Sequence, residues 1–179
     1  MATVKRNRLF CNKIWQVTRY LFLALDRTAP LDSQMLKESK DYLMINQWIM
    51  SSLNNMVYNV DAGLSRYDFH HATEALYNFL YTRLCDVYIE AIKPLTEQNQ
   101  KESLLVLAVC LDVALRCLAP FMPFLSEELY QRLHEKLALH EIKLRRSPSI
   151  LIAHYPTKNE VLNMFFYLFS SFSYVNFLN

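Results

Sequence analysis

The chain has 179 residues, of which 53% are hydrophobic, 20% charged and 13% aromatic, and its formal net charge is +2. This length and composition fit one globular domain whose core needs no disulfide support. The chain contains a single glycine, which excludes the Gly-rich phosphate loops of Walker, Rossmann and kinase proteins. Hairpin-rich β architectures are also disfavoured, so we predict a mostly helical protein.

The first 25 residues carry five basic side chains and no acidic one. Apolar residues recur there at intervals of three or four, which predicts an amphipathic α-helix. Its apolar side consists of Phe10, Ile14, Val17, Leu21 and Leu25. The opposite side carries Lys5, Arg8, Asn12, Trp15 and Arg19.

Two interpretations of this outward face remain open. It could contact phosphates and bases of a nucleic acid, or it could be a solvated basic face whose tryptophan packs against a neighbouring domain. An acid-free basic helix is also typical of a mitochondrial presequence, but the aromatic content and the apolar side favour a helix that stays in the fold.

The next elements follow from capping and breaking residues. Residues 26–40 are predicted to form a connection with one helical turn after Ser33. Further helices are predicted over residues 41–65 and over 68–93, the second with Asp68 as N-cap and Pro94 as terminator. Gly63, near the end of the first of these, fits a C-terminal stop, with continuation of the turn through Leu64 and Ser65 as the alternative. Two more helices are predicted from about 98 to 118 and from about 124 to 137.

These elements predict an all-α fold, an antiparallel bundle of four to five helices. The segment 147–156 lies between prolines and is predicted to be a short strand or an extended strap that closes the bundle. We place the domain boundary after Pro156. Residues 157–179 form a tail that carries no charge from Val161 onward, and it could be a packing extension, a non-native terminus or a membrane anchor.

Charged residues within the predicted helices favour a structural role. Asp112 and Arg116 are four residues apart and are predicted to pair within one helix. Arg83, Asp86 and Glu90 share a side of another helix. Because no nucleophile accompanies them, we interpret these groups as an internal ion network that sets helix register, and not as acid–base catalysts.

We predict no catalytic, metal or cofactor residue. His70 and Glu74 have the spacing of metal ligands on a helix but no third ligand, which favours a capping or surface role. The cysteines form no CxxC pair and are predicted to be small core residues in a reducing compartment. They are Cys11, Cys85, Cys110 and Cys117.

Four segments resemble the C-terminal helical region of class I valyl-tRNA synthetases. Residues 11–15 (CNKIW) resemble the start of that family's anticodon-binding bundle. Residues 67–94, from YDFH at 67–70 through LCDVYIEAIKP at 84–94, resemble its middle helix, and this segment points to the valine enzyme among its relatives. Residues 118–129 (LAPFMPFLSEEL) resemble a motif that the isoleucine, leucine and methionine enzymes also share. Residues 149–156 (SILIAHYP) resemble the segment that closes the bundle in the valine enzyme. The resemblance covers roughly residues 6–156.

The resemblance implies binding to the anticodon stem and loop of valine tRNA. Candidate contacts are Lys5, Arg8, Asn12, Lys13, Trp15 and Arg19. The family's activating motifs, of the His-x-Gly-His and Lys-Met-Ser-Lys-Ser types, do not occur here, so we expect no activity from this chain alone. ATP with magnesium, and the partnership of a catalytic domain, belong to the full-length family enzyme.

The resemblance further implies a cytoplasmic protein, with mitochondria as the alternative. No membrane contact is expected unless residues 161–179 are an anchor. The family also continues with charged sequence where this chain has its aromatic tail, so the chain is a fragment, an alternative product or one with a non-native end. The competing function is a helical module that docks a protein or a membrane and binds no RNA.

Overall fold

The computed structural model describes residues 2–28, 44–95, 97–140, 142, 144–161 and 163. Within them lie six α-helices, one π-helix, one 3-10 turn and no strand. The α-helices are α1 (Ala2–Arg27), α2 (Met44–Ser65), α3 (Phe69–Tyr77), α4 (Ile89–Ile92), α5 (Glu97–Leu118) and α6 (Pro123–Leu139). The π-helix is η2 (Asn78–Tyr88), and the 3-10 turn is η3 (Ile150–Ile152). The prediction of an all-α fold is confirmed.

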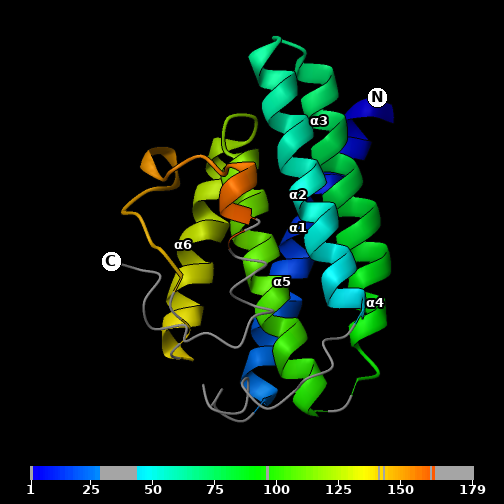
Figure 1. Cartoon of the computed structure of the whole chain (residues 1–179), viewed down its shortest axis with the longest axis vertical. Helices are drawn as coiled ribbons and strands as arrows, with labels where there is room; N and C mark the ends of the chain where they lie inside the picture. Colours follow the sequence, from blue (N-terminus) through cyan, green and yellow to red (C-terminus); the bar gives the residue numbers. More distant parts are fainter. Residues whose placement is uncertain are drawn as a thin grey trace.

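The bundle is built around α5. Elements α3, η2 and α4 follow one another without a break and form one long rod, so the α-helices occupy five rods. Consecutive rods run in opposite directions, and α5 lies among the others (Figure 1). Every residue from Glu102 to Ala119 is buried, which is the pattern of a central helix that other helices cover on all sides.

The predicted apolar side of α1 faces the core. Ile14, Val17, Leu21 and Leu25 are all at most 4% exposed. Phe10 is half-buried, and its ring packs against Tyr77 with the centroids 5.3 Å apart. Four consecutive buried positions on one side of the helix confirm the amphipathic prediction for α1.

The turn between α2 and α3 corrects the role predicted for Gly63. Asp68 is the N-cap, as predicted, because its Oδ1 accepts a hydrogen bond from His71 N at 3.1 Å. The helix α2 continues past Gly63 to Ser65, which is the predicted end and the alternative given for Gly63, and Tyr67 adopts the left-handed conformation with φ of 58°. A Cβ on Gly63 would lie 2.9 Å from both Asp68 O and Ala72 N. The glycine therefore permits close approach of α2 and α3 and is no helix stop.

The rod from α3 to α4 matches the predicted helix over residues 68–93 in extent, but its middle is wider than an α-helix. In η2 the hydrogen bonds span five residues, as from Ile89 N to Leu84 O. Such geometry is rare and concentrates at functional sites. No feature of the sequence predicted it, because α- and π-helices share the same local propensities.

The internal ion network is confirmed around Arg116. Its guanidinium donates to Asp112 Oδ2 at 3.0 Å, to Glu160 Oε1 at 2.9 Å and to the carbonyl of His154 at 3.0 Å. His134 Nε2 lies 2.9 Å from Asp112 Oδ1. Burial alone would lower the pKa of Arg116, but the charges of Asp112 and Glu160 raise it above its ordinary value. The guanidinium therefore stays charged and ties the closing segment to α5.

The same prediction is wrong for the charged side chains of η2 and α4. Arg83, Asp86 and Glu90 are exposed. Each bonds a different partner: Arg83 donates to Ser52 Oγ at 3.1 Å, and the two carboxylates pair with Lys13 at 2.7 Å and Lys93 at 2.5 Å. The three residues share one side of the helix, as predicted, but that side faces outward, so they form no internal network.

The segment 147–156 is a strap and not a strand. Ser149 and Ala153 have extended backbones, but the turn η3 separates them. Glu127 on α6 anchors this strap by accepting hydrogen bonds from Ser149 Oγ at 2.7 Å and Ile150 N at 2.8 Å. The predicted closing segment thus covers the bundle through specific polar contacts.

The anchor at Glu127 predicts a pH-dependent stability. Burial raises the pKa of this carboxyl, but hydrogen bonds from Gln131, Ser149 and Ile150 outweigh burial and bring the pKa below its ordinary value of 4.5. A lowered pKa stabilises the folded state above pH 4.5, and this contribution is lost as the pH falls through the folded-state pKa. We expect Glu127→Gln to lower the melting temperature at pH 7, with a difference from wild type that shrinks below about pH 4.5.

Thermal unfolding at pH 7, 5 and 3 measures this effect. Glu135→Gln is the control, because Glu135 is an exposed carboxylate of the same helix. A Glu127→Gln difference that stays constant across the three pH values would contradict the anchoring role.

All four cysteines are free in the described structure. Cys85, Cys110 and Cys117 are buried and Cys11 is half-buried. Burial raises the pKa of the Cys85 and Cys117 thiols to about 12. These thiols are therefore neutral, which confirms the core role predicted for the buried three.

Some predicted elements lie outside the described residues. They are most of the connection 26–40 with its turn after Ser33, the first three residues of the predicted second helix, and the tail beyond residue 163. Glu160 and Val161 lie within the described part, and Val161 is fully buried against the bundle. None of the helices described is long and apolar enough to span a bilayer.

Candidate nucleic-acid interface

One line of residues on α1 combines cations, an amide and an aromatic ring. Arg8, Asn12 and Arg19 are exposed, and Trp15 is 38% exposed. Their spacing of four, three and four residues places them along one side of the helix. We call Arg8, Asn12, Trp15 and Arg19 the α1 stripe. The structure therefore brings four of the six predicted site residues together on the surface.

The other two predicted residues are not part of this stripe. Lys5 belongs to α1, but its side chain lies outside what the structure describes. Lys13 points to the opposite flank from Trp15, because two residues correspond to about 200° around a helix. Its Nζ lies 2.7 Å from Asp86 Oδ1 and 4.4 Å from the centre of the Tyr81 ring. The hydrogen bond to Asp86 raises the pKa of Lys13. The ammonium group of Lys13 is therefore already neutralised by a carboxylate of η2.

Helix α6 adds a cation that sequence reasoning missed. Arg132 lies over the ring of Trp15, with its Cζ 5.5 Å from the ring centre. It also donates to Glu128 at 2.6 Å. In the sequence Arg132 shows only an i,i+4 pair with Glu128, which is typical of any solvated helix surface. Only the packing of α6 beside α1 puts it next to the stripe.

The arginines of the stripe are available for a ligand. Within the described part of the chain, neither Arg8 nor Arg19 has an acidic partner. The acid that follows on α1, Asp26, is held by Lys136 Nζ at 2.5 Å and by His140 at 3.5 Å. Two unneutralised guanidinium groups beside an exposed indole suit phosphates and bases, because arginine pairs with phosphate and aromatic rings stack on bases.

The spacing of His70 and Glu74 does not produce a metal site in the described structure. Both side chains are exposed on α3. No cluster of three or more His, Cys, Asp or Glu side chains that could hold a metal ion occurs among the described residues. Glu74 instead lines a hollow between α2 and the rod that contains α3.

Comparison with known proteins identifies the family. Residues 46–176 match the family model described as the anticodon-binding domain of tRNA ligase. Because this match covers most of the chain, the chain belongs to the family of anticodon-binding domains of tRNA ligases. The match begins within α2, and α1 precedes it.

The chain is similar to valine–tRNA ligases from distant organisms. It is 36% identical to the enzyme of Homo sapiens over 160 residues, which are 86% of this chain and 12% of that protein. It is 38% identical to the Thermotoga maritima enzyme over 142 residues, 79% of this chain and 16% of that protein. A probable mitochondrial valine–tRNA ligase of Dictyostelium discoideum is 34% identical over 173 residues, 84% of this chain and 16% of that protein. The chain thus spans a small part of these curated relatives.

Proposed function

We propose that this domain binds the anticodon stem and loop of valine tRNA through the α1 stripe, as part of a valine–tRNA ligase. The observation that carries the proposal is the stripe itself, in which Arg8 and Arg19 flank an exposed amide and an exposed indole. Family membership supports RNA as the ligand, and similarity to valine–tRNA ligases supports valine tRNA.

Each side chain of the stripe has a role that its chemistry suits. Arg8 and Arg19 neutralise phosphates of the backbone. Trp15 stacks on a base or a ribose of the unpaired loop. Arg132 packs over the indole, but its charge is already paired with Glu128, so its part is to position the ring. Asn12 can donate to and accept from a base edge, so it is the member of the stripe that reads sequence.

The enzymatic step is assigned to another part of the ligase. With one glycine and no activating motif, this chain has no loop that could cradle ATP, and its described residues offer no magnesium cluster. We therefore assign ATP, magnesium and valine activation to a catalytic domain, which is the proposed partner of this one. Residues 1–156 are the proposed RNA-binding unit, and the proposed compartment is the cytoplasm, with mitochondria as the alternative.

A binding titration tests the proposal. The full chain is titrated against fluorescent valine tRNA transcripts with the native anticodon and with an altered one, at 50 and 200 mM salt. We expect tighter binding of the native anticodon and weaker binding at high salt, because phosphate contacts release counterions. Equal affinity for both transcripts, or an affinity that salt leaves unchanged, would overturn the proposal and favour docking to a protein or a membrane.

A further inference from the structure

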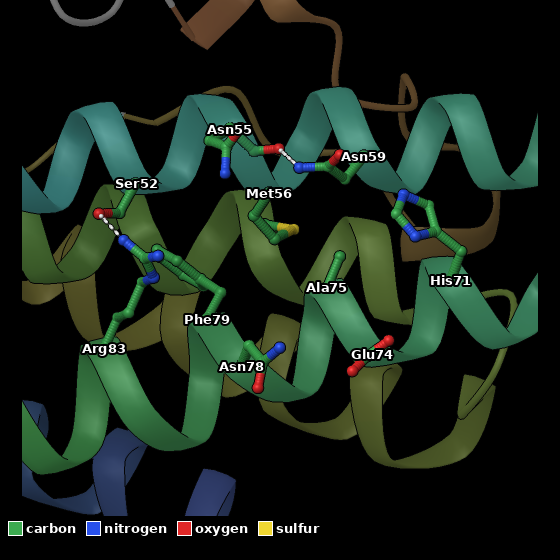
Figure 2. A pocket seen from close by; sticks show the side chains of 10 residues that line it. All are labelled: Ser52, Asn55, Met56, Asn59, His71, Glu74, Ala75, Asn78, Phe79 and Arg83. Carbon is green, nitrogen blue, oxygen red and sulfur yellow. Dashed lines mark hydrogen bonds between the residues drawn. The ribbon is translucent and has the colours of Figure 1, made fainter.

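A second polar site lies on the other side of η2. A hollow of about 180 Å³ opens between α2 and the rod formed by α3 and η2. Figure 2 shows polar side chains entering it from both helices. We call it the α2–α3 hollow. The polar residues at its rim are Asn55, Asn59, His71, Glu74, Asn78 and Arg83.

The floor of this hollow is apolar and firmly packed. Met56 is 2% exposed and Phe79 is 1% exposed. Ala75 adds a small side chain between them and the rim. An apolar floor beneath a polar rim suits a flat ligand whose faces are apolar and whose edges carry hydrogen-bonding groups.

Some side chains of the rim already hydrogen-bond within the protein, and others have no partner there. Arg83 Nη1 donates to Ser52 Oγ at 3.1 Å, and Asn59 Nδ2 donates to the carbonyl of Asn55 at 2.7 Å. The side chains of Asn55, His71, Glu74 and Asn78 bond to nothing else that the structure describes. Two amides, one imidazole and one carboxylate are therefore available to a ligand. Amides and a neutral imidazole offer both a donor and an acceptor, whereas a carboxylate only accepts.

The charge and the volume of the hollow disfavour other common ligands. A phosphate would meet the Glu74 carboxylate, with one arginine opposite. A dinucleotide or other large cofactor would need more space, since such pockets measure roughly 300–1,000 Å³. A single nucleobase fits both the size and the mixed polarity, because its edge combines donors and acceptors and its face is apolar.

We propose that the α2–α3 hollow holds one unstacked nucleobase of the RNA, with the Glu74 carboxylate accepting a hydrogen bond from an exocyclic amino group. The proposal rests on the proposed RNA binding and adds a second contact to it. Cytosine, adenine and guanine carry an amino group and uracil does not. Where cytosine carries its 4-amino group, uracil presents the carbonyl oxygen O4, which a carboxylate repels because both only accept hydrogen bonds. The hollow therefore discriminates against uracil.

The position and geometry of η2 support a separate site. Asn78, Phe79 and Arg83 all come from this π-helix, and π-helical geometry concentrates at functional sites. On its other flank η2 is joined to α1 by the Lys13–Asp86 pair. RNA that reaches both the α1 stripe and the hollow would cross the Lys13 flank of α1 and then pass around η2.

Nucleotide titrations test the hollow directly. CMP and UMP are added to the isotope-labelled full chain, and amide chemical shifts are followed by NMR. We expect CMP to shift the resonances of Asn55, Glu74 and Asn78, with affinity at least about 10-fold higher than UMP, because UMP places its O4 carbonyl where the cytosine amino group donates to the charged Glu74 carboxylate. Equal affinity for CMP and UMP, or shifts confined to other surfaces, would overturn the proposal.

Variants separate this site from the α1 stripe. Glu74→Gln is expected to abolish the preference for CMP and to weaken tRNA binding about 10-fold without changing its salt dependence. The control Glu135→Gln removes the same charge from an exposed position on α6 and should change neither. If tRNA binds wild type and Glu74→Gln equally, the hollow proposal fails and the stripe proposal stands. If CMP binds as expected but tRNA does not bind, the stripe proposal fails and the base site stands.

Discussion

Asp112→Ala is expected to destabilise the domain by about 3–5 kcal/mol, because it leaves a buried guanidinium with too few partners. The side chains of Arg116 and Asp112 are 8% and 4% exposed. In the variant, Arg116 keeps only Glu160 and the carbonyl of His154. For a domain of this size the loss corresponds to roughly 6–20 °C in melting temperature, which thermal unfolding followed by circular dichroism measures.

The exposed pair of Arg132 and Glu128 supplies a matched control. It has the same i,i+4 spacing and a direct contact of 2.5 Å, against 2.9 Å for Arg116 and Asp112, but its side chains are 55% and 51% exposed. Glu128→Ala should cost less than about 1 kcal/mol, since water solvates the arginine that remains. The double variant Asp112→Ala/Arg116→Met should recover part of the loss, because it removes the stranded charge. Equal costs for Asp112→Ala and Glu128→Ala would contradict a desolvated network.

The paired substitution Arg8→Ala/Arg19→Ala is expected to weaken binding of valine tRNA about 100-fold, at about 1.5 kcal/mol for each charge-assisted contact. The slope of log affinity against log salt should become shallower by about 1.4–1.8, since each phosphate contact contributes about 0.7–0.9. Both quantities come from fluorescence titrations at several salt concentrations. Neither arginine packs in the core, so the fold should remain intact.

The control for the double substitution also removes two positive charges, but from positions outside the α1 stripe. Arg27 and Arg145 are exposed, and Arg27→Ala/Arg145→Ala lowers the net charge by the same amount. A general electrostatic attraction would weaken equally in both double variants. An unchanged salt slope in Arg8→Ala/Arg19→Ala would place the RNA on another face of the bundle.

Local sequence signals determined the helices and the α1 stripe. The apolar repeat from Phe10 to Leu25 defines both sides of α1, because helical periodicity is a property of neighbouring residues. Asp68 and Pro94 mark the ends of the long rod for the same reason, since caps and breakers act within one turn. The pairing of Asp112 with Arg116 was also predictable, because both lie on one helix.

Contacts between distant segments were decided only by the tertiary structure. Arg132 reaches Trp15, Lys13 is held by Asp86, and Glu160 completes the network at Arg116 through helix packing that no local pattern encodes. The role of Gly63 could not be predicted either, because only the close approach of α2 to α3 explains why a glycine is needed there. The α2–α3 hollow likewise exists only where two rods meet. Helix formation depends on interactions within about four residues, whereas sites depend on how separate helices dock.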